Sequence, residues 1–160
     1  STNPPNPMNW VLDQSKTEVI KMNSYNGTCG CGNIEYSFED EPINTIFCYC
    51  LECQTHTGSD KWFGMWVPVE KFKFTKGTPS NFTRIGDSGK DVNHKFCSEC
   101  GVTLCAEITF GKFYSVGVST LRDNNHFSPK MAIYTKSAPK WAVFPEGVPK
   151  FDKLPPGMED

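Results

Sequence analysis

The 160-residue sequence predicts an all-β domain of antiparallel sheets with little helix. Short stretches alternate apolar and polar residues, as strands with one buried face do. Glycine-containing turn signals separate these stretches. No long stretch repeats its apolar residues at the helical period. A chain of this length can bury roughly 70% of the surface that its unfolded form exposes, so it can build a core of its own.

The predicted strands can be placed along the chain from residue 34 onward. Alternating, β-branched or aromatic residues occupy residues 34–38, 62–67, 72–74, 103–108 and 113–118. Turn signals follow at residues 76–77, 85–89 and 110–112. Residues 68–71 are predicted to form a single helical turn. This succession of short strands is typical of an antiparallel all-β domain.

The ends of the chain differ in composition from its middle. Residues 1–23 are rich in Pro and Asn at their start and are predicted to be an N-terminal extension that docks through Trp10. Residues 24–147 form the predicted domain, and residues 148–160 form a predicted C-terminal tail. There is no internal repeat.

Charge and hydropathy argue against two classes of partner. The formal net charge is -2 and no run of Lys and Arg is present, which argues against nucleic-acid binding. No stretch approaches the ~18 apolar residues of a membrane span, and the first residues contain no apolar signal core. No membrane partner is therefore expected, and the sequence leaves the oligomeric state open.

Eight cysteines carry the strongest functional signal. Seven of them are separated from another cysteine by one or two intervening residues: Cys29, Cys31, Cys48, Cys50, Cys53, Cys97 and Cys100. A one-residue separation is too tight for an unstrained disulfide within the pair. A two-residue separation is the usual spacing of a metal knuckle. The pattern favours metal over disulfides and therefore a reducing compartment, the cytoplasm.

Cys29, Cys31, Cys97 and Cys100 form the first predicted metal group. In an extended strand, residues i and i+2 share a face, so Cys29 and Cys31 are expected to present their thiolates together. Gly101, after the second pair, can adopt the left-handed conformation that turns backbone amides toward sulfur. Four thiolates leave no open position on Zn²⁺, so this site is predicted to be structural. The alternative is that the first pair consists of small buried apolar residues.

Cys48, Cys50 and Cys53 form the second predicted metal group. Three protein ligands and one open position are the usual arrangement of a catalytic zinc. Two alternatives stay open: His56 could complete a Cys₃His site, or Cys105 a Cys₄ site. Cys105 is otherwise expected to be a buried strand residue, and His56 a proton carrier near the metal.

The ligands of the second group suggest a chemistry. Three thiolates donate strongly, so the metal is a weaker Lewis acid than one held by histidines. Such a metal suits holding a substrate thiolate better than making hydroxide. A thiol in the open position would lose its proton and lie beside an electrophile. Catalytic roles are therefore predicted for Cys48, Cys50 and Cys53 as ligands and for His56 as proton carrier.

Several motifs recur in a known order along the chain. They are residues 27–32, 48–53 with Thr57-Gly58, 96–101, 117–121, Pro129 and Trp141. Together they resemble the glutathione-dependent formaldehyde-activating enzyme family, which includes the centromere protein V-like domains. The resemblance covers residues 24–145.

The resemblance implies a zinc-bound β-tent fold, with a structural zinc on the first group and a labile or catalytic zinc on the second. It also implies carbon–sulfur lyase activity, the joining of glutathione and formaldehyde as S-(hydroxymethyl)glutathione. The expected partner is a small-molecule thiol or carbonyl substrate such as glutathione. This agrees with the thiolate argument, in which a sulfur on zinc attacks a carbonyl carbon.

Three positions depart from the family's pattern: Tyr49 and Ala132 stand where a His is common, and His94 where an Arg is common. They bear on specificity for the small substrate. The carboxylates of glutathione call for cationic partners. The candidates for them are Lys61, Arg84, Lys95 and Arg122.

Three functions compete at this point. The first is a zinc-dependent lyase or adduct-forming enzyme, and the second is a related enzyme for another small electrophile or thiol in specialised metabolism. The third is a non-catalytic zinc module that binds a partner through aromatic side chains. The aromatic residues in question are Trp62, Phe63, Trp66 and Trp141.

Overall fold

The computed structural model describes residues 9–13 and 18–158, and it confirms the all-β fold. The strands are β1 (Asn9–Asp13), β2 (Glu18–Met22), β3 (Ser24–Thr28), β4 (Glu35–Glu39), β5 (Asn44–Cys48), β6 (Trp62–Pro68), β7 (Phe72–Lys76), β8 (Ser80–Ile85), β9 (Asp91–Phe96), β10 (Thr103–Ile108), β11 (Phe113–Gly117) and β12 (Met131–Ile133). The helical elements in the described ranges are α1 (Leu51–Thr57) and the 3₁₀ turns η1 (Val69–Lys71), η2 (Val118–Thr120) and η3 (Thr135–Ser137).

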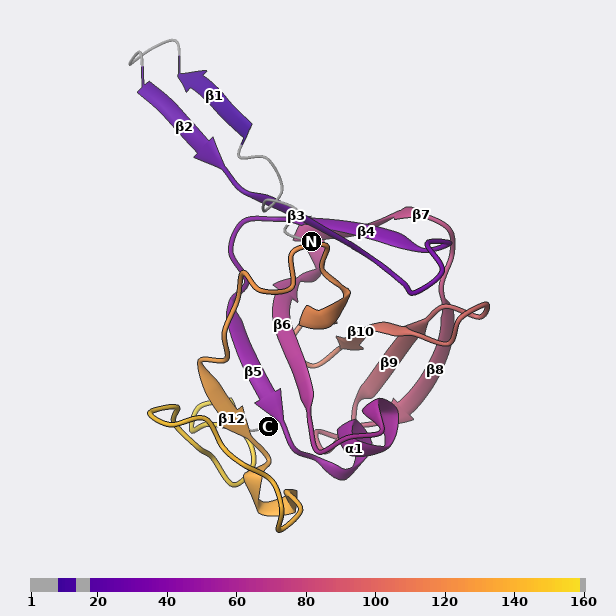
Figure 1. The fold of residues 1–160 in the computed structure, drawn as a ribbon, viewed down its shortest axis with the longest axis vertical. Helices are drawn as coiled ribbons and strands as arrows, with labels where there is room; N and C mark the ends of the chain where they lie inside the picture. The colour runs from indigo at the N-terminus through magenta and orange to yellow at the C-terminus, as the bar shows by residue number, and fades with distance from the viewer. Residues whose placement is uncertain (1–8, 14–17, 159–160) are drawn as a thin grey trace.

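The strands form a two-stranded, a three-stranded and a seven-stranded sheet (Figure 1). The order is β1-β2 in the first, β3-β4-β7 in the second and β12-β5-β6-β11-β10-β9-β8 in the third. All described strand pairs are antiparallel except β12 and β5, which run parallel. The parallel pair departs from the wholly antiparallel expectation, and it places β12 beside the strand that ends in Cys48.

The main strand predictions are confirmed by β4, β6, β7, β10 and β11, and the predicted helical turn by η1. Helix α1 lies in the second cysteine group, where no helix is predicted from the sequence. It has seven residues, none of them buried. A helix without a buried face carries no apolar stripe, so the helical period could not reveal it.

The seven-stranded sheet buries its two faces in different ways. On one face, Met65 and Val67 of β6 join a core with aromatic residues of the three-stranded sheet such as Tyr36. On the other face, Trp66 of the same strand packs with Ile46 of β5. Because side chains alternate along a strand, the sheet has the core with Tyr36 on one face. The opposite face, which carries Ile46 and Trp66, is called the second surface below. This sheet positions the second cysteine group and, together with the three-stranded sheet, the first.

The segment expected to be a C-terminal tail lies along β12 as far as residue 158. Phe151 donates from its backbone N–H to the carbonyl of Ala132 at 2.9 Å, and Tyr134 donates to the carbonyl of Lys153 at 3.0 Å. Phe151, Leu154 and Met158 pack against the second surface of the seven-stranded sheet. This segment therefore adds a wall to that surface.

The N-terminal prediction falls largely outside the described structure. In the extension, β1 pairs with β2 in an antiparallel ladder. The side chain of Trp10 and residues 1–8, 14–17 and 159–160 lie outside the described residues, so docking through Trp10 stays a prediction. In the described ranges, no helix is both long and apolar enough to cross a membrane.

Candidate metal centres

The first cysteine group joins turns from two different sheets. Cys29 and Cys31 lie in the turn after β3, and Cys97 and Cys100 in the turn between β9 and β10. The Sγ atoms of Cys29 and Cys31 are 3.7 Å apart, as are those of Cys31 and Cys97. Tetrahedral ligands at the Zn–S distance of about 2.3 Å would be about 3.8 Å apart. The four sulfurs, all within 4.8 Å of one another, therefore fit a zinc ion.

The expected extended conformation at Cys29 and Cys31 is wrong. The backbone N–H of Gly32 donates to the carbonyl of Cys29 at 3.4 Å, which closes a turn, and Gly32 has φ 82°. That left-handed conformation suits glycine, so the residue bends the chain where a strand was expected. The prediction for Gly101 is confirmed: its φ is 77°, and its N–H donates to the carbonyl of Cys97 at 2.8 Å.

Backbone amides prepare the first group for a cation. Burial opposes ionisation of Cys29, but the N–H of Ile34 donates to its Sγ at 3.3 Å and helps lower its pKa to about 6. The backbone at Val102 likewise lowers the pKa of Cys100. A lowered pKa favours the thiolate, which is the form that binds metal.

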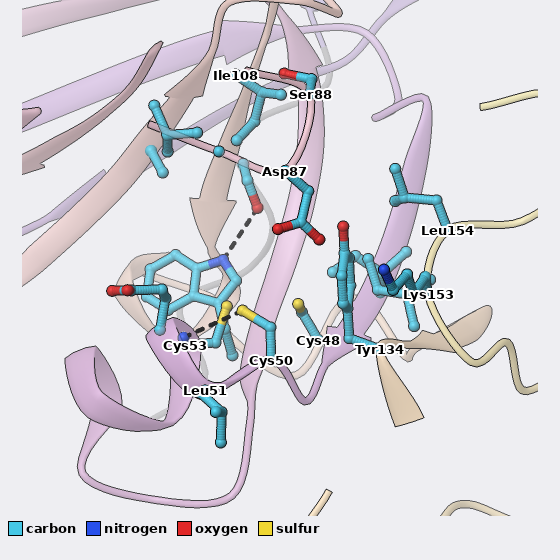
Figure 2. Close-up of a pocket in the computed structure, with 18 of the residues that line it drawn as sticks. Cys48, Cys50, Leu51, Cys53, Asp87, Ser88, Ile108, Tyr134, Lys153 and Leu154 are labelled. Carbon is cyan, nitrogen blue, oxygen red and sulfur yellow. Dashed lines mark hydrogen bonds between the residues drawn. The ribbon is translucent and has the colours of Figure 1, made fainter. Parts of the chain in front are cut away.

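The second cysteine group is built on the start of α1. Cys48 ends β5, Cys50 is the N-cap of α1, and Cys53 lies in the first turn. The backbone N–H of Cys53 donates to the Sγ of Cys50 at 3.3 Å (Figure 2). The Sγ of Cys50 therefore caps the helix by accepting this N–H and at the same time lies beside the sulfurs of Cys48 and Cys53. All three sulfurs lie within 4.8 Å of one another.

The three thiols of the second group influence one another's ionisation. Hydrogen bonds from the thiols of Cys48 and Cys53 lower the pKa of Cys50 to about 3. Hydrogen bonds with Cys48 and then with Cys50 raise the pKa of Cys53, and the hydrogen bond with Cys50 raises that of Cys48. One thiolate is thus stabilised at the expense of the other two, which need a cation beside them to lose their protons.

Neither proposed fourth ligand joins the second group. Its members among the described residues are Cys48, Cys50 and Cys53. Cys105 is fully buried in the core between the sheets, so the Cys₄ alternative is wrong. His56 lies outside the group and stacks on His94, with ring centroids 3.9 Å apart. The described group is therefore one ligand short of a tetrahedron.

A cavity of about 640 Å³ lies against the second group. All three cysteines line it, together with His56. Its floor is the second surface of the seven-stranded sheet, and the C-terminal segment adds Leu154 and neighbouring residues (Figure 2). The volume is in the range of small-molecule sites.

A histidine and an arginine meet at the β8–β9 side of this cavity. Arg84 donates from Nε to Nε2 of His94 at 3.0 Å, and the same Nε is 4.0 Å from a carboxylate oxygen of Glu52. Burial, His56 and Arg84 together lower the pKa of His94 to about 4. His94 is therefore neutral at pH 7 and accepts from Arg84.

Tyr134 and Asp87 face each other in the cavity near the cysteines (Figure 2). Burial and then a hydrogen bond with Asp87 raise the pKa of Tyr134. Tyr134 has φ 54°, a conformation that costs free energy for a non-glycine residue. Sequence reasoning missed both residues, since nothing in their spacing connects the β8–β9 turn with the end of β12.

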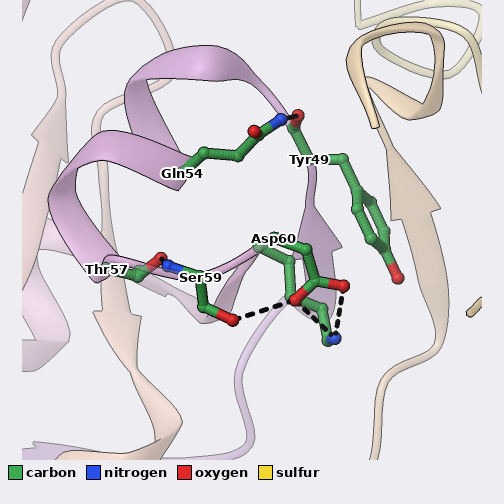
Figure 3. A network of polar contacts seen from close by, with 6 residues as sticks. Tyr49, Gln54, Thr57, Ser59 and Asp60 are labelled. Carbon is green, nitrogen blue, oxygen red and sulfur yellow. Dashed lines mark hydrogen bonds and ion pairs between the residues drawn. The ribbon is translucent and has the colours of Figure 1, made fainter. Parts of the chain in front are cut away.

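The opposite side of α1 is fixed by polar contacts. Gln54 donates from its amide to the carbonyl of Tyr49 at 2.9 Å (Figure 3). The same amide donates to the carbonyl of Ser137 at 3.0 Å. Asp60 accepts from Ser59 and from Lys61, both at 3.1 Å. The two bonds of Gln54 anchor α1, which carries Cys53 and has Cys50 as its N-cap. The Asp60 contacts order the segment that follows the helix.

Only some of the positions that depart from the family's pattern, and only some of the predicted cationic residues, line the cavity. Of the three departures, only His94 lines it, while the side chains of Tyr49 and Ala132 are fully buried elsewhere. Of the four cations, only Arg84 lines it. The ammonium of Lys61 is bound to Asp60, outside the cavity.

Comparison with known proteins gives one informative match. The model of a family described as glutathione-dependent formaldehyde-activating enzyme matches residues 24–137. The crystal structure of a Rhodobacter sphaeroides protein has 19% sequence identity and a TM-score of 0.49, and the match covers 79% of this chain and 98% of that chain. None of the curated proteins that were compared matches the chain. The residues in the family match include both cysteine groups.

Proposed function

Because the chain belongs to the family of glutathione-dependent formaldehyde-activating enzymes, we propose that it is a lyase that makes or breaks a carbon–sulfur bond between a thiol and a small carbonyl compound. S-(hydroxymethyl)glutathione is the adduct that the family's description suggests. The observation that carries the proposal is the second cysteine group, whose three sulfurs line a large cavity without a fourth ligand in the described group.

The proposed metal is Zn²⁺ at both groups. Four sulfurs with tetrahedral spacing suit a structural ion at the first group, and three sulfurs suit a catalytic or labile ion at the second. Bound there, zinc would supply a position that takes a substrate thiol and lowers its pKa. Cys48, Cys50 and Cys53 hold that position at the cavity wall.

The reaction balances without an oxidant or a reductant. The thiol sulfur forms a bond to the carbonyl carbon, the π electrons of the C=O bond move to oxygen, and the proton lost by sulfur ends on that oxygen. His56 lines the cavity and is the proposed carrier of this proton. The reverse sequence cleaves the adduct.

The experiment removes one sulfur of the second group and measures metal and activity together. Zinc-loaded wild type should contain two zinc ions per chain and accelerate exchange between thiol, formaldehyde and adduct, followed by NMR. Cys50→Ser should keep one zinc and lose at least ~100-fold in rate, since a bound metal contributes several kcal/mol to such a reaction.

Cys105→Ala is the matched control because it also removes a thiol. That thiol lies in the core between the sheets and outside both groups, so two zinc ions and the wild-type rate are expected. A Cys50→Ser protein that holds one zinc and still works at the wild-type rate would contradict the proposal.

A further inference from the structure

Trp62 is set into the cavity floor beside the second cysteine group. It is the cross-strand partner of Cys48 in the β5–β6 ladder, so the two side chains share a face of the sheet. Its indole Nε1 donates to the Oγ of Ser115 at 3.0 Å. An aromatic ring is thus held in a fixed orientation next to a predicted metal ligand.

Two glycines make room for this ring. Gly64 and Gly117 are cross-strand partners in the β6–β11 ladder. A Cβ on Gly64 would lie 2.7 Å from the indole nitrogen of Trp62, and one on Gly117 would lie 2.9 Å from its Cη2. A side chain at Gly117 would force the ring to shift, and one at Gly64 would force Trp62 or the still closer Oγ of Ser115 to shift. The glycine pair therefore leaves a depression in the sheet in which the indole lies, and the ring forms a platform on the cavity floor.

The rest of the cavity floor is apolar. Its buried apolar residues, besides Cys48, are Ile46, Trp66, Val92, Ala106, Phe113 and Ile133. The buried polar residues of the lining are Ser115 and His94, and each already accepts a hydrogen bond, from Trp62 and from Arg84. A ligand on this floor gains free energy by burying apolar surface.

The charges of the lining balance one another. Its cations are Arg84, Lys136 and Lys153, and its acids are Glu52, Asp87 and Asp152. Among these Lys, Arg, Asp and Glu side chains, three against three leaves no surplus of positive charge, and none of the six is buried. Arg84 is already engaged by His94 and Glu52. Glutathione, with more carboxylates than ammonium groups, would need a surplus of cations.

The geometry points to an apolar thiol with an aromatic ring close to its sulfur as the preferred substrate of this cavity. The inference rests on the proposed function, in which that sulfur bonds to a carbonyl carbon at the second cysteine group. The ring of the thiol stacks on Trp62 while its sulfur lies at Cys48, Cys50 and Cys53. The thiol proton moves to the carbonyl oxygen, as in the general reaction.

The test compares benzyl mercaptan with glutathione on the zinc-loaded full chain. Calorimetry without formaldehyde measures binding, and NMR exchange with formaldehyde measures turnover. Benzyl mercaptan should bind at least ~10-fold more tightly, because aromatic stacking adds to the burial of apolar surface. Tighter binding of glutathione would overturn the inference.

Variants of the platform separate stacking from general damage. Trp62→Leu should lose about 10-fold in affinity for benzyl mercaptan and leave glutathione binding unchanged, with two zinc ions retained. Gly117→Ala, which displaces the ring without removing it, should act in the same direction. The exposed Trp141 lies outside the lining, so Trp141→Leu should match wild type. Equal losses for both thiols in both platform variants would contradict the stacking role.

The two proposals fail in different ways. Faster turnover of the glutathione adduct than of the benzyl adduct would overturn the substrate class and leave the proposed function standing. Acceleration of neither adduct by protein with two zinc ions would overturn the proposed function and the substrate assignment with it.

Discussion

The two cysteine groups share one ligand chemistry and differ in what surrounds them. The first connects the turn after β3 with the turn between β9 and β10, so it ties the three-stranded sheet to the seven-stranded sheet. The second draws its sulfurs from one short segment at the end of β5 and the start of α1, and faces a cavity. A metal at the first group closes a long loop, whereas one at the second group holds only local chain. Under the proposed function, the complete group that joins two sheets is structural, and the three-sulfur group that faces the cavity is reactive.

The largest expected difference follows from removing one sulfur from each group. Cys97→Ser should lower the free energy of unfolding by several kcal/mol and yield little folded protein, because structural zinc can contribute roughly 10–16 kcal/mol. Cys53→Ser should lose the second zinc and remain folded. Zinc content and urea unfolding of both variants provide the measurement. Equal stability losses in the two variants would contradict the assignment of different roles to the two groups.

A buried histidine with a lowered pKa lies beside the second cysteine group. His94, buried beside the second group, has a pKa of about 4 against an ordinary value of 6.5. The unfolded chain therefore binds the extra proton between these values, and stability falls as pH drops through that window. The loss attributable to His94 should be about 2 kcal/mol between pH 8 and pH 5.

Urea unfolding of wild type and His94→Gln at pH 8, 6.5 and 5 measures this loss as the difference between their pH profiles. The variant keeps a polar side chain but cannot titrate in that window. If the two proteins lose stability in parallel, His94 is not responsible for the acid sensitivity near the second group.

A smaller effect is expected from the contacts that hold α1. Gln54 bonds two backbone carbonyls, those of Tyr49 and Ser137, so Gln54→Ala should cost about 1–2 kcal/mol. The loss should be accompanied by faster release of one zinc to a chromogenic chelator, since α1 carries Cys53. Thr55→Ala on the exposed side of α1 is the control, with little change in zinc release. Slow, unchanged release in Gln54→Ala would show that α1 does not need this anchor.

The sequence predicted the groups better than their conformations. Cysteine spacing was sufficient for the groups because metal ligands must lie close together, and Gly101 was assigned correctly from its place after a knuckle. A C-x-C pair suits either a turn or a strand, so the sequence does not distinguish the two at Cys29. Helix α1 was missed because its seven residues bury nothing.

The residues that line the cavity were harder to predict from the sequence than the cysteine groups. The sequence identifies Trp62 only as an aromatic residue, since its proposed role depends on the pairing of Gly64 with Gly117 across two strands. Asp87 and Tyr134 are 47 positions apart, and only the packing of the β8–β9 turn against the end of β12 brings them together. Contacts of this kind cannot be predicted from the spacing of residues along the chain.

An effect no larger than that of Gln54→Ala is expected from a matched pair of glycines, one beside each group. Gly58 ends α1 with φ 68°, and Gly101 follows Cys100 with φ 77°. Each donates its N–H to a carbonyl four residues earlier, at 2.9 and 2.8 Å, and a Cβ on either would meet no atom within 4 Å. Alanine at either position should therefore cost about 1–2 kcal/mol through left-handed strain alone.

Because the strain is the same, the two glycine variants differ only in which group they loosen. Gly58→Ala should speed the release of one zinc to a chelator and leave the second ion in place, since the change is confined to the helix of the reactive group. Gly101→Ala should lower the unfolding midpoint in urea by a similar amount and bring the loss of the structural ion closer to global unfolding. Identical release profiles in the two variants would mean that the groups are coupled through the seven-stranded sheet, so that their division into structural and reactive sites would not hold.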